Sequence, residues 1–216
     1  MSQRKESRPP RKTEAEIEVL VFDMGHVFVD FDWEEVCLGF CRRAEISMDE
    51  FKPILKHIAS LGYETGHINT QGLLDQIQRV SQIKLAKDEF KDLWNATFRE
   101  NDDMSALLQE LKLNYPLYLL SNTNECHWQY LESNYRVSRH FDHLVLSYEV
   151  GLAKPDHRIY HEVVNKSGRR PESCLFIDDL KANVEAARAV GMQAIQFQNH
   201  GDLVSELAEL GIVKDS

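Results

Sequence analysis

Polar side chains of complementary types stand at the ends of short apolar runs, or just beyond them, at widely separated positions in the chain. They are Asp23, Ser121, Asn122, Lys154, Asp178 and Asp179. If the acids met, their carboxylates would repel one another and raise one another's pKa. A divalent cation relieves that repulsion, and hard oxygen ligands suit Mg²⁺. The lysine, hydroxyl and amide would then supply the charge and donors that hold a transferring phosphoryl group. These residue types therefore predict metal-assisted phosphoryl transfer.

The apolar runs that precede these residues are typical of buried strands, because they are short and rich in β-branched and other apolar side chains. They cover residues 18–23, 116–120, 143–146, 174–177 and 193–197. Stretches with helical periodicity separate them at 104–111, 159–164 and 184–190. Strands that alternate with helices predict an α/β fold with a doubly wound parallel sheet. Ligands of such sheets bind at the carboxyl edge, where we expect the polar residues to meet.

The chain between the first two predicted strands is far longer than a crossover connection requires. Its pattern is almost wholly helical, with amphipathic stretches at about 34–44, 49–61, 70–80 and 87–99. Within the last stretch, Phe90, Trp94 and Phe98 recur at helical spacing, which favours a core stripe over a ligand-binding cluster. We therefore predict a helical cap over residues 32–100, inserted into an α/β core formed by 17–31 and 101–216.

Composition and charge exclude some classes of function. Of the 216 residues, 43% are hydrophobic, which is ordinary for a globular protein. The net charge of −10 is unfavourable for binding nucleic acid. Residues 1–16 differ from the rest, since this stretch is basic and nearly free of apolar side chains. We predict that it forms a disordered, solvated tail.

The sequence also bears on the compartment of the protein. No apolar run approaches the ~18–20 residues that cross a bilayer, and the N-terminus lacks the apolar region of a secretory signal. Neither export nor a membrane partner is expected, so a cytoplasmic location follows. The four cysteines show no pattern typical of a disulfide framework or a zinc site, and Cys174 is expected in the core. The oligomeric state stays open between a monomer and a weak dimer.

Four motifs of the chain, taken in order, resemble those of the haloacid dehalogenase-like superfamily in its phosphatase branch. They are Phe22-Asp-Met-Gly-His-Val27, Leu119-Leu-Ser-Asn122, Gly151-Leu-Ala-Lys-Pro155, and Phe176-Ile-Asp-Asp179 followed by Asn183. The resemblance spans roughly residues 18–200. It implies a Rossmann-like core with a small helical cap inserted between the first and second motifs, and a small phosphorylated metabolite as the partner.

The same resemblance implies a role for each motif residue. Asp23 would attack phosphorus and form an aspartyl phosphate, while Ser121, Asn122 and Lys154 would bind the phosphate, with Lys154 also assisting catalysis. A second set of groups would ligate Mg²⁺: the carboxylates of Asp23 and Asp179, the backbone carbonyl of Gly25, and Asp178 directly or through water.

Gly25 departs from the family pattern, because most family phosphatases have there a second Asp that acts as general acid and base. Losing a positioned proton donor typically lowers the rate by ~10²–10⁴-fold. Three interpretations stay open: a phosphatase that uses another group, one limited to good leaving groups, or a non-catalytic relative that binds a phosphorylated metabolite. A 2-haloacid dehalogenase is a further alternative, which the paired acids Asp178 and Asp179 disfavour since that reaction needs no metal. A phosphomutase ranks low because it depends on the missing Asp.

The segment Val27-Phe-Val-Asp-Phe-Asp32 resembles a subgroup similar to α-glucose-1-phosphate phosphatases, which carries Asp-x-Gly-x-Val. This resemblance favours an active enzyme for a sugar phosphate such as a hexose 1-phosphate, whose anomeric phosphate leaves easily. His26 or Glu64 is then the candidate proton donor, and Glu64 could also bind sugar hydroxyls from a cap loop. The structural alternatives are that His26 packs beneath the loop and that Glu64 is an ordinary exposed turn residue.

Overall fold

Five parallel strands form the centre of the protein, seen here in a computed structural model that describes residues 15–81 and 83–214. From one edge to the other the order is β5 (His143–Leu146), β4 (Leu117–Ser121), β1 (Val19–Phe22), β6 (Cys174–Asp178) and β7 (Gln193–Gln196). These strands coincide with the five predicted runs, and the predicted α/β class with a doubly wound parallel sheet is confirmed. The predicted tail over 1–16 lies outside the described residues except for its last two.

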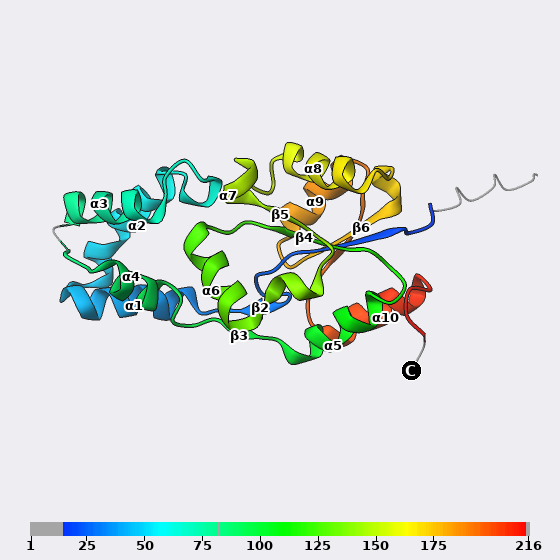
Figure 1. Cartoon of the computed structure of the whole chain (residues 1–216), viewed down its shortest axis with the longest axis horizontal. Helices are drawn as coiled ribbons and strands as arrows, with labels where there is room; N and C mark the ends of the chain where they lie inside the picture. The colour runs from blue at the N-terminus through cyan, green and yellow to red at the C-terminus, as the bar shows by residue number, and fades with distance from the viewer. Residues whose placement is uncertain (1–14, 82, 215–216) are drawn as a thin grey trace, which may run out of the picture.

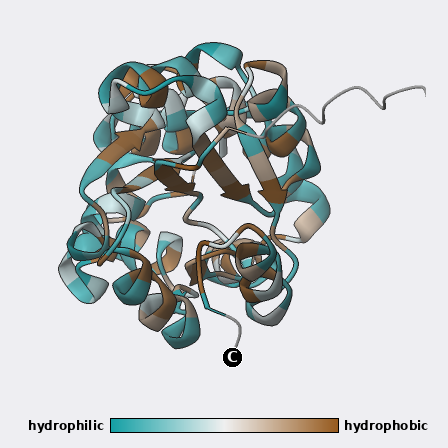
Figure 2. Cartoon of the chain, turned by 90° about the vertical axis from the view of Figure 1, so that its right-hand side faces the viewer, coloured by the Kyte–Doolittle hydropathy of each residue, from teal (hydrophilic) through white to brown (hydrophobic). Residues whose placement is uncertain are grey.

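Alternate residues of each central strand pack on opposite faces of the sheet, as the two-residue period of a strand requires. Val19 and Val21 face helices α8 (His157–Ser167) and α9 (Lys181–Ala189) in one hydrophobic cluster. Leu20 and Phe22 face the other cluster, to which three further helices contribute: α5 (Asp102–Leu111), α6 (Glu125–Tyr135) and α10 (His200–Glu209). Figure 1 shows the helices on both faces, and Figure 2 shows the apolar strands between them.

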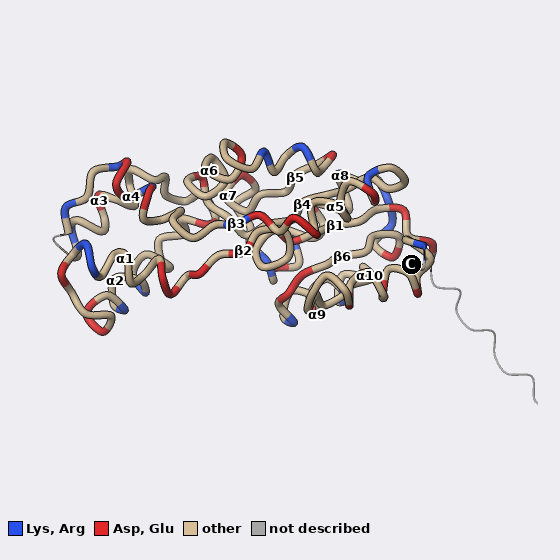
Figure 3. Tube along the Cα trace, turned by 90° about the horizontal axis from the view of Figure 1, so that it is seen from below, with Lys and Arg blue, Asp and Glu red and all other residues tan. Residues whose placement is uncertain are grey.

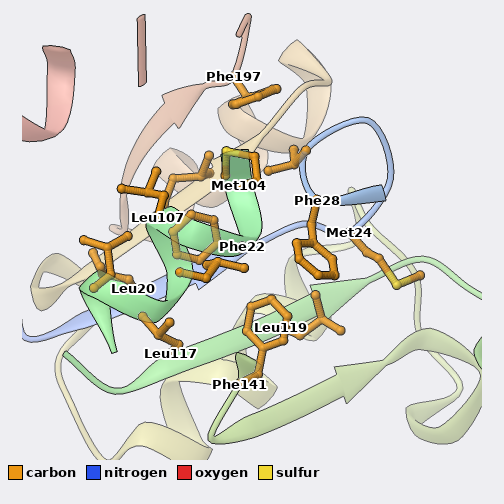
Figure 4. Close-up of a cluster of buried hydrophobic side chains, with 14 of the residues drawn as sticks. Leu20, Phe22, Met24, Phe28, Met104, Leu107, Leu117, Leu119, Phe141 and Phe197 are labelled. Atoms are coloured by element: carbon orange, nitrogen blue, oxygen red, sulfur yellow. The ribbon is translucent and has the colours of Figure 1, made fainter. Parts of the chain in front are cut away.

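The cluster on the second face fixes the position of the loop that follows β1. Met24 and Phe28 belong to this loop and pack into the same cluster as Phe22 and Leu119 of the strands (Figure 4). All four side chains are at most 5% exposed. The loop is therefore anchored on both sides of the residues that carry the predicted chemistry.

A second group of helices has a hydrophobic core of its own at the far end of the molecule (Figure 1). It consists of α1 (Trp33–Ala44), α2 (Met48–Ser60), α3 (Thr70–Ser81) and α4 (Lys87–Trp94), with a short 3-10 turn at Tyr63–Thr65. Lysine, arginine, aspartate and glutamate residues of both signs occur along these helices (Figure 3). The four helices lie where the amphipathic stretches predicted them. The division into a cap over 32–100 and a core over 17–31 and 101–216 stays a prediction.

The fourth predicted helix is shorter than its pattern suggested, and the expected end at residue 99 was wrong. Helix α4 ends at Trp94, and the side-chain amide of Asn95 donates back to the Lys91 carbonyl. Residues Arg99–Glu100 instead form β3, which pairs antiparallel with β2 (Val29–Asp30). The pairing of β2 with β3 joins the chain segments that enter and leave the helical group. Residues in β3 cannot at the same time continue helix α4, so the helix ends before them. As a result, Phe98 leaves the stripe formed by Phe90 and Trp94 and packs against the other core.

Short elements complete the fold: α7 (Ser147–Val150) and 3-10 turns at Val137–His140 and Pro171–Ser173. Cys174 is fully buried, as predicted, and all four cysteines are free thiols. Within the described residues, none of the helices combines the length and apolar character needed to span a bilayer.

Candidate active site

Three adjacent strands bring the predicted polar residues to one edge of the sheet. The register pairs Phe22 of β1 with Leu119 of β4 on one side and with Ile177 of β6 on the other. The next residue of β1 is Asp23, whose backbone N–H donates to the Ile177 carbonyl at 2.8 Å. Asp178 ends β6, and Ser121 ends β4. The predicted meeting of these residues at the carboxyl edge follows directly from this register.

The ammonium group of Lys154 contacts both Asp23, which follows β1, and Asp178, which ends β6. Its Nζ donates to Asp23 Oδ1 at 2.6 Å and to Asp178 Oδ2 at 2.7 Å. All three residues are buried, at 5%, 7% and 0% exposure for Lys154, Asp23 and Asp178. A buried charge is tolerated only when it is paired and hydrogen-bonded, which this arrangement provides.

The surrounding protein shifts the pKa values of both Asp23 and Lys154. Burial raises the pKa of Asp23 to about 6, although the Lys154 ammonium acts in the opposite direction. Burial opposes the charge on Lys154, but the two neighbouring carboxylates outweigh it and raise its pKa. Lys154 therefore stays charged at neutral pH, and any further cation beside Asp23 would favour the ionised carboxylate.

Asp178 uses its carboxylate mainly to hold its neighbours. Besides Lys154, it accepts hydrogen bonds from the Asn183 amide at 3.0 and 3.1 Å and from the Leu180 backbone N–H at 2.8 Å. Asn183 lies in α9, one turn beyond the strand end. In the sequence, Asn183 was included with the fourth motif, but no role was predicted for it. The structure thus gives Asp178 a positioning role, while direct ligation of a metal by this residue stays a prediction.

Three carboxylates at this edge of the sheet lie close enough together to fit a divalent cation. Asp23, Asp178 and Asp179 each place one carboxylate oxygen within 4.8 Å of the others. Burial raises the pKa of Asp179, with Asp178 as the next cause. Asp179 forms no salt bridge to a lysine or arginine among the described residues, and the Gly25 carbonyl accepts no hydrogen bond there. Three acids beside one lysine leave negative charge on hard oxygen atoms, and such a set of oxygen atoms suits Mg²⁺.

Ser121 and Asn122 differ in how far their side chains are free to bind a ligand. Ser121 Oγ is buried without a hydrogen-bond partner in the described part of the chain, so it is available to a phosphate oxygen. The Asn122 amide is occupied, because it donates to the Lys154 carbonyl at 2.9 Å and accepts from the Lys154 N–H at 2.8 Å. These contacts make Asn122 a residue that positions Lys154, and phosphate binding by its side chain stays a prediction.

The place of the missing second Asp is filled by an aromatic ring. A Cβ atom added to Gly25 would lie 3.2 Å from Phe31 Cε1. The His26 ring stacks on Phe31 with centroids 4.4 Å apart, and its backbone has a positive φ of 55°. His26 is exposed and does not line the cavity beside the site. Its ring therefore contacts Phe31 at the surface of the loop, and a role of His26 in proton transfer stays a prediction.

A cavity of about 720 Å³ opens from the loops that follow β1 and β4 toward the helical group. Gly25, Asn122 and Ala153 line its inner end, and each is a close neighbour in sequence of a candidate catalytic residue. Glu64 lines the cavity from the 3-10 turn, and its role in binding or proton transfer stays a prediction. Although Glu64 as a whole is exposed, surrounding protein removes water from its carboxyl group and raises its pKa.

The turn that carries Glu64 contacts the core in two places that the sequence did not reveal. Ser147 Oγ donates to the Glu64 carbonyl at 2.6 Å. Gly66, with a φ of 70°, lies so close to the core that an added Cβ would meet the Tyr148 carbonyl oxygen at 2.2 Å. Neither Ser147 nor Tyr148 belongs to a motif, so no spacing signal identified them.

His127 makes a third contact of this kind, on the opposite wall. Its Nε2 bonds to the Trp94 carbonyl at 3.2 Å, and its Nδ1 lies 3.1 Å from the Asn124 amide nitrogen. A carbonyl only accepts, so Nε2 carries the proton and Nδ1 accepts, which is a neutral imidazole. Burial lowers the pKa of His127 to about 4, in agreement with this assignment. In the sequence it was one of nine scattered histidines without a pattern.

Comparisons with known proteins support the four motifs. A relative, the D-ribitol-5-phosphate phosphatase of Bacteroides thetaiotaomicron, is 27% identical over 204 residues, which cover 88% of this chain and 97% of that protein. A sesquiterpene phosphatase of Aspergillus oryzae is 27% identical over 194 residues, or 88% of this chain and 94% of that one. A solved structure of a HAD family enzyme from B. thetaiotaomicron, in complex with magnesium and inorganic phosphate, has a TM-score of 0.74 at 27% identity. The match covers 84% of this chain and 94% of that one.

The family profile that matches this chain spans residues 17–191 and so includes every motif residue discussed above. The fold, the paired acids at the sheet edge and this match agree. The chain belongs to the haloacid dehalogenase-like hydrolase family.

Proposed function

We propose that this protein is a Mg²⁺-dependent phosphatase that hydrolyses a small phosphate monoester through an aspartyl phosphate on Asp23. The observation that carries the proposal is the buried contact of Lys154 with Asp23 and Asp178 beside a third acid, Asp179. Asp23 and Asp179, with the Gly25 carbonyl, would hold the metal ion. The ion would supply positive charge next to the nucleophile and the phosphate oxygens, which lessens the repulsion between two anions.

The reaction requires two displacements at phosphorus. A carboxylate oxygen of Asp23 attacks the phosphorus, and the bond from phosphorus to the ester oxygen breaks. A water molecule then attacks the phosphorus of the aspartyl phosphate, releasing inorganic phosphate and restoring the carboxylate. Lys154 and the Ser121 hydroxyl stabilise the charge that develops on the phosphoryl oxygens.

The leaving alcohol must gain a proton, and Gly25 cannot supply it. Glu64 is the better of the two predicted candidates, because it lines the cavity and burial of its carboxyl group raises its pKa, which favours the acid form. His26 lies outside the lining of the cavity. We therefore assign the proton donor to Glu64.

The names of the relatives limit the class of substrate only in part. Their names indicate a polyol phosphate in one case and a sesquiterpene phosphate in another, which are alcohols of opposite polarity. The sugar phosphate predicted from the Val27–Asp32 segment therefore stays a prediction. The class that these relatives share is a small phosphorylated metabolite.

Phosphate release from p-nitrophenyl phosphate tests the proposal. We expect release with Mg²⁺, loss of release with a chelator, and recovery when Mg²⁺ is returned. The Asp23→Asn variant should lose at least ~10⁴-fold in kcat, as expected for removal of a nucleophile. Asp75→Asn, a change to an exposed acid of α3, is the matched control and should keep full activity.

Three results would overturn the proposal. The first is hydrolysis that persists in Asp23→Asn or without metal. The second is release of chloride from 2-chloropropionate by a protein that releases no phosphate, because this outcome would identify the dehalogenase alternative. The third is absence of both activities with phosphate still binding, which would identify a non-catalytic relative.

A further inference from the structure

We propose that the cavity beside Asp23 binds a bulky apolar alcohol, so that the substrates are phosphate monoesters of hydrophobic rather than polyhydroxylated alcohols. This inference rests on the proposed phosphatase function, since it assigns the cavity to the leaving group. It differs from the sugar phosphate that the sequence favoured.

Aromatic and aliphatic side chains make up most of the cavity wall. Phe31, Trp33, Trp94 and Phe98 supply aromatic surface, and Leu55 and Ile58 of α2 supply aliphatic surface. The rings contact one another, with Trp33 and Trp94 at 5.1 Å between centroids and Phe31 and Phe98 at 5.7 Å. Trp33 is 39% exposed, which is unusual for so large an apolar side chain and leaves its surface available to a ligand.

The polar groups of the wall are mostly already bonded within the protein. The Asn122 amide is occupied by the backbone of Lys154, and both nitrogens of His127 have partners. The Tyr63 hydroxyl lies 2.9 Å from Thr70 Oγ1, and the Thr65 hydroxyl bonds to the Gly62 carbonyl and to His67. Each of these groups already spends part of its hydrogen-bonding capacity within the protein, so fewer positions remain for the hydroxyls of a substrate.

Few polar groups therefore remain for the alcohol. Lys56 and Glu64 are the charged residues of the wall, and Glu64 is assigned to proton transfer. Two buried atoms, Thr123 Oγ1 and Trp94 Nε1, have no partner in the described part of the chain. A polyol carries a hydroxyl on almost every carbon, and each one that loses water without gaining a partner weakens binding. An apolar alcohol meets no such cost, and its burial is favourable.

The size of the cavity agrees with this assignment. A volume of about 720 Å³ lies within the ~300–1,000 Å³ of pockets that enclose drug-sized ligands. The space therefore exceeds what a short alkyl phosphate fills, and transition-state binding should improve as the alcohol becomes larger and stays apolar.

A series of ethyl, butyl and hexyl phosphates tests the inference, because the three alcohols differ in apolar surface and scarcely in leaving-group ability. We expect kcat/KM to rise at least ~10-fold from ethyl to hexyl phosphate. Hexyl phosphate should exceed sorbitol 6-phosphate, which has the same number of carbons, by roughly 10²-fold. A flat series, or a preference for the sorbitol ester, would overturn the inference.

A polar substitution in the wall provides the matched variant. Leu55→Gln should reduce the ratio of kcat/KM between hexyl and ethyl phosphate to near unity. Leu113→Gln changes an exposed apolar residue away from the cavity, at 81% exposure, and should leave the ratio as in the wild type. An unchanged ratio in Leu55→Gln would place the hydrophobic selectivity elsewhere and contradict the assignment.

Binding of alkylphosphonates separates this inference from the proposed function, since these compounds are not hydrolysed. Calorimetry should show hexylphosphonate binding at least ~10-fold more tightly than ethylphosphonate, with a negative heat-capacity change. If hydrolysis fails with every ester but this difference is found, the proposed function is wrong and the apolar pocket stands. If p-nitrophenyl phosphate is hydrolysed but the difference is missing, the function stands and the apolar pocket is wrong.

Discussion

The inner and outer ends of the cavity are built in opposite ways. Behind the inner end, Lys154, Asp23 and Asp178 are buried charges whose contacts are 2.6 and 2.7 Å long, and each is held by its own strand or loop. At the outer end, apolar rings from several helices share the wall, and the polar groups point into bonds within the protein. A buried charge is stable only when an opposite charge or a hydrogen-bond partner lies at the correct distance. An apolar wall needs only a complementary shape and enough contact area. Substitutions should therefore act strongly and specifically at the inner end, and more weakly toward the outer end.

Removal of the buried ammonium should have the largest effect. Lys154→Met leaves the carboxylates of Asp23 and Asp178 buried without their cation, which should lower the free energy of unfolding by about 3–5 kcal/mol. It also removes a group that stabilises the phosphoryl oxygens, so kcat should fall by ~10²–10³-fold. Urea unfolding and phosphate release, each with and without Mg²⁺, measure the two effects.

An exposed ion pair supplies the control for this variant. Lys52 Nζ and Asp49 Oδ1 of α2 are 2.8 Å apart, only slightly farther than the buried contacts of Lys154, but both side chains are exposed. Lys52→Met should produce no resolvable change in stability or rate. Equal effects of the two substitutions would show that burial does not distinguish the inner end of the cavity.

The difference between the two ends also explains how much could be predicted from sequence. Ser121 and Asp178 end their strands, and Asp23 and Asp179 directly follow theirs, so the register of a parallel sheet was enough to bring them together. The apolar wall depends on which face each helix turns inward, and Trp94 and Phe98 at helical spacing favoured a core stripe although both line the cavity. The end of α4 was missed because the pairing of β2 with β3 is a long-range contact without a local signal.

Glu64 lies between the two ends, and its variant tests whether it donates the proton. Glu64→Gln should lower kcat for hexyl phosphate by about 10²-fold and leave p-nitrophenyl phosphate nearly unaffected, because nitrophenolate leaves without a proton. The wild-type rate should decline as the pH rises through the raised pKa of Glu64, since the acid form is the active one. The variant should lack this decline. If His26→Gln reproduces the loss and Glu64→Gln does not, the assignment is reversed.

Gly66 tests the contact between this turn and the core. Gly66→Ala places a Cβ 2.2 Å from the Tyr148 carbonyl oxygen at a φ of 70°, so the turn must move away from the core. We expect kcat/KM to fall about 10-fold because Glu64 moves with the turn. Gly168→Ala is the control, since its φ is 62° but nothing lies within 4 Å of the added atom. The control should lose only the ~1–2 kcal/mol of stability that a left-handed alanine costs, with no loss of activity.

The smallest effect is expected at His127, where the apolar wall meets the core. Its pKa in the folded protein is about 4, below the ordinary value of 6.5, so the unfolded chain binds a proton more readily than the folded one. Stability from this group is complete above pH 6.5 and is lost as the pH falls toward 4. Between pH 7.5 and 5.5 the loss should be about 1 kcal/mol. His127→Phe, which keeps the ring against Trp94 and Phe98, should remove that part of the pH dependence while losing the bond to the Trp94 carbonyl. Urea unfolding of both proteins at the two pH values measures the difference. An identical pH dependence in the variant would mean that the imidazole is not held neutral, and that the contact between the helical group and the core does not rely on it.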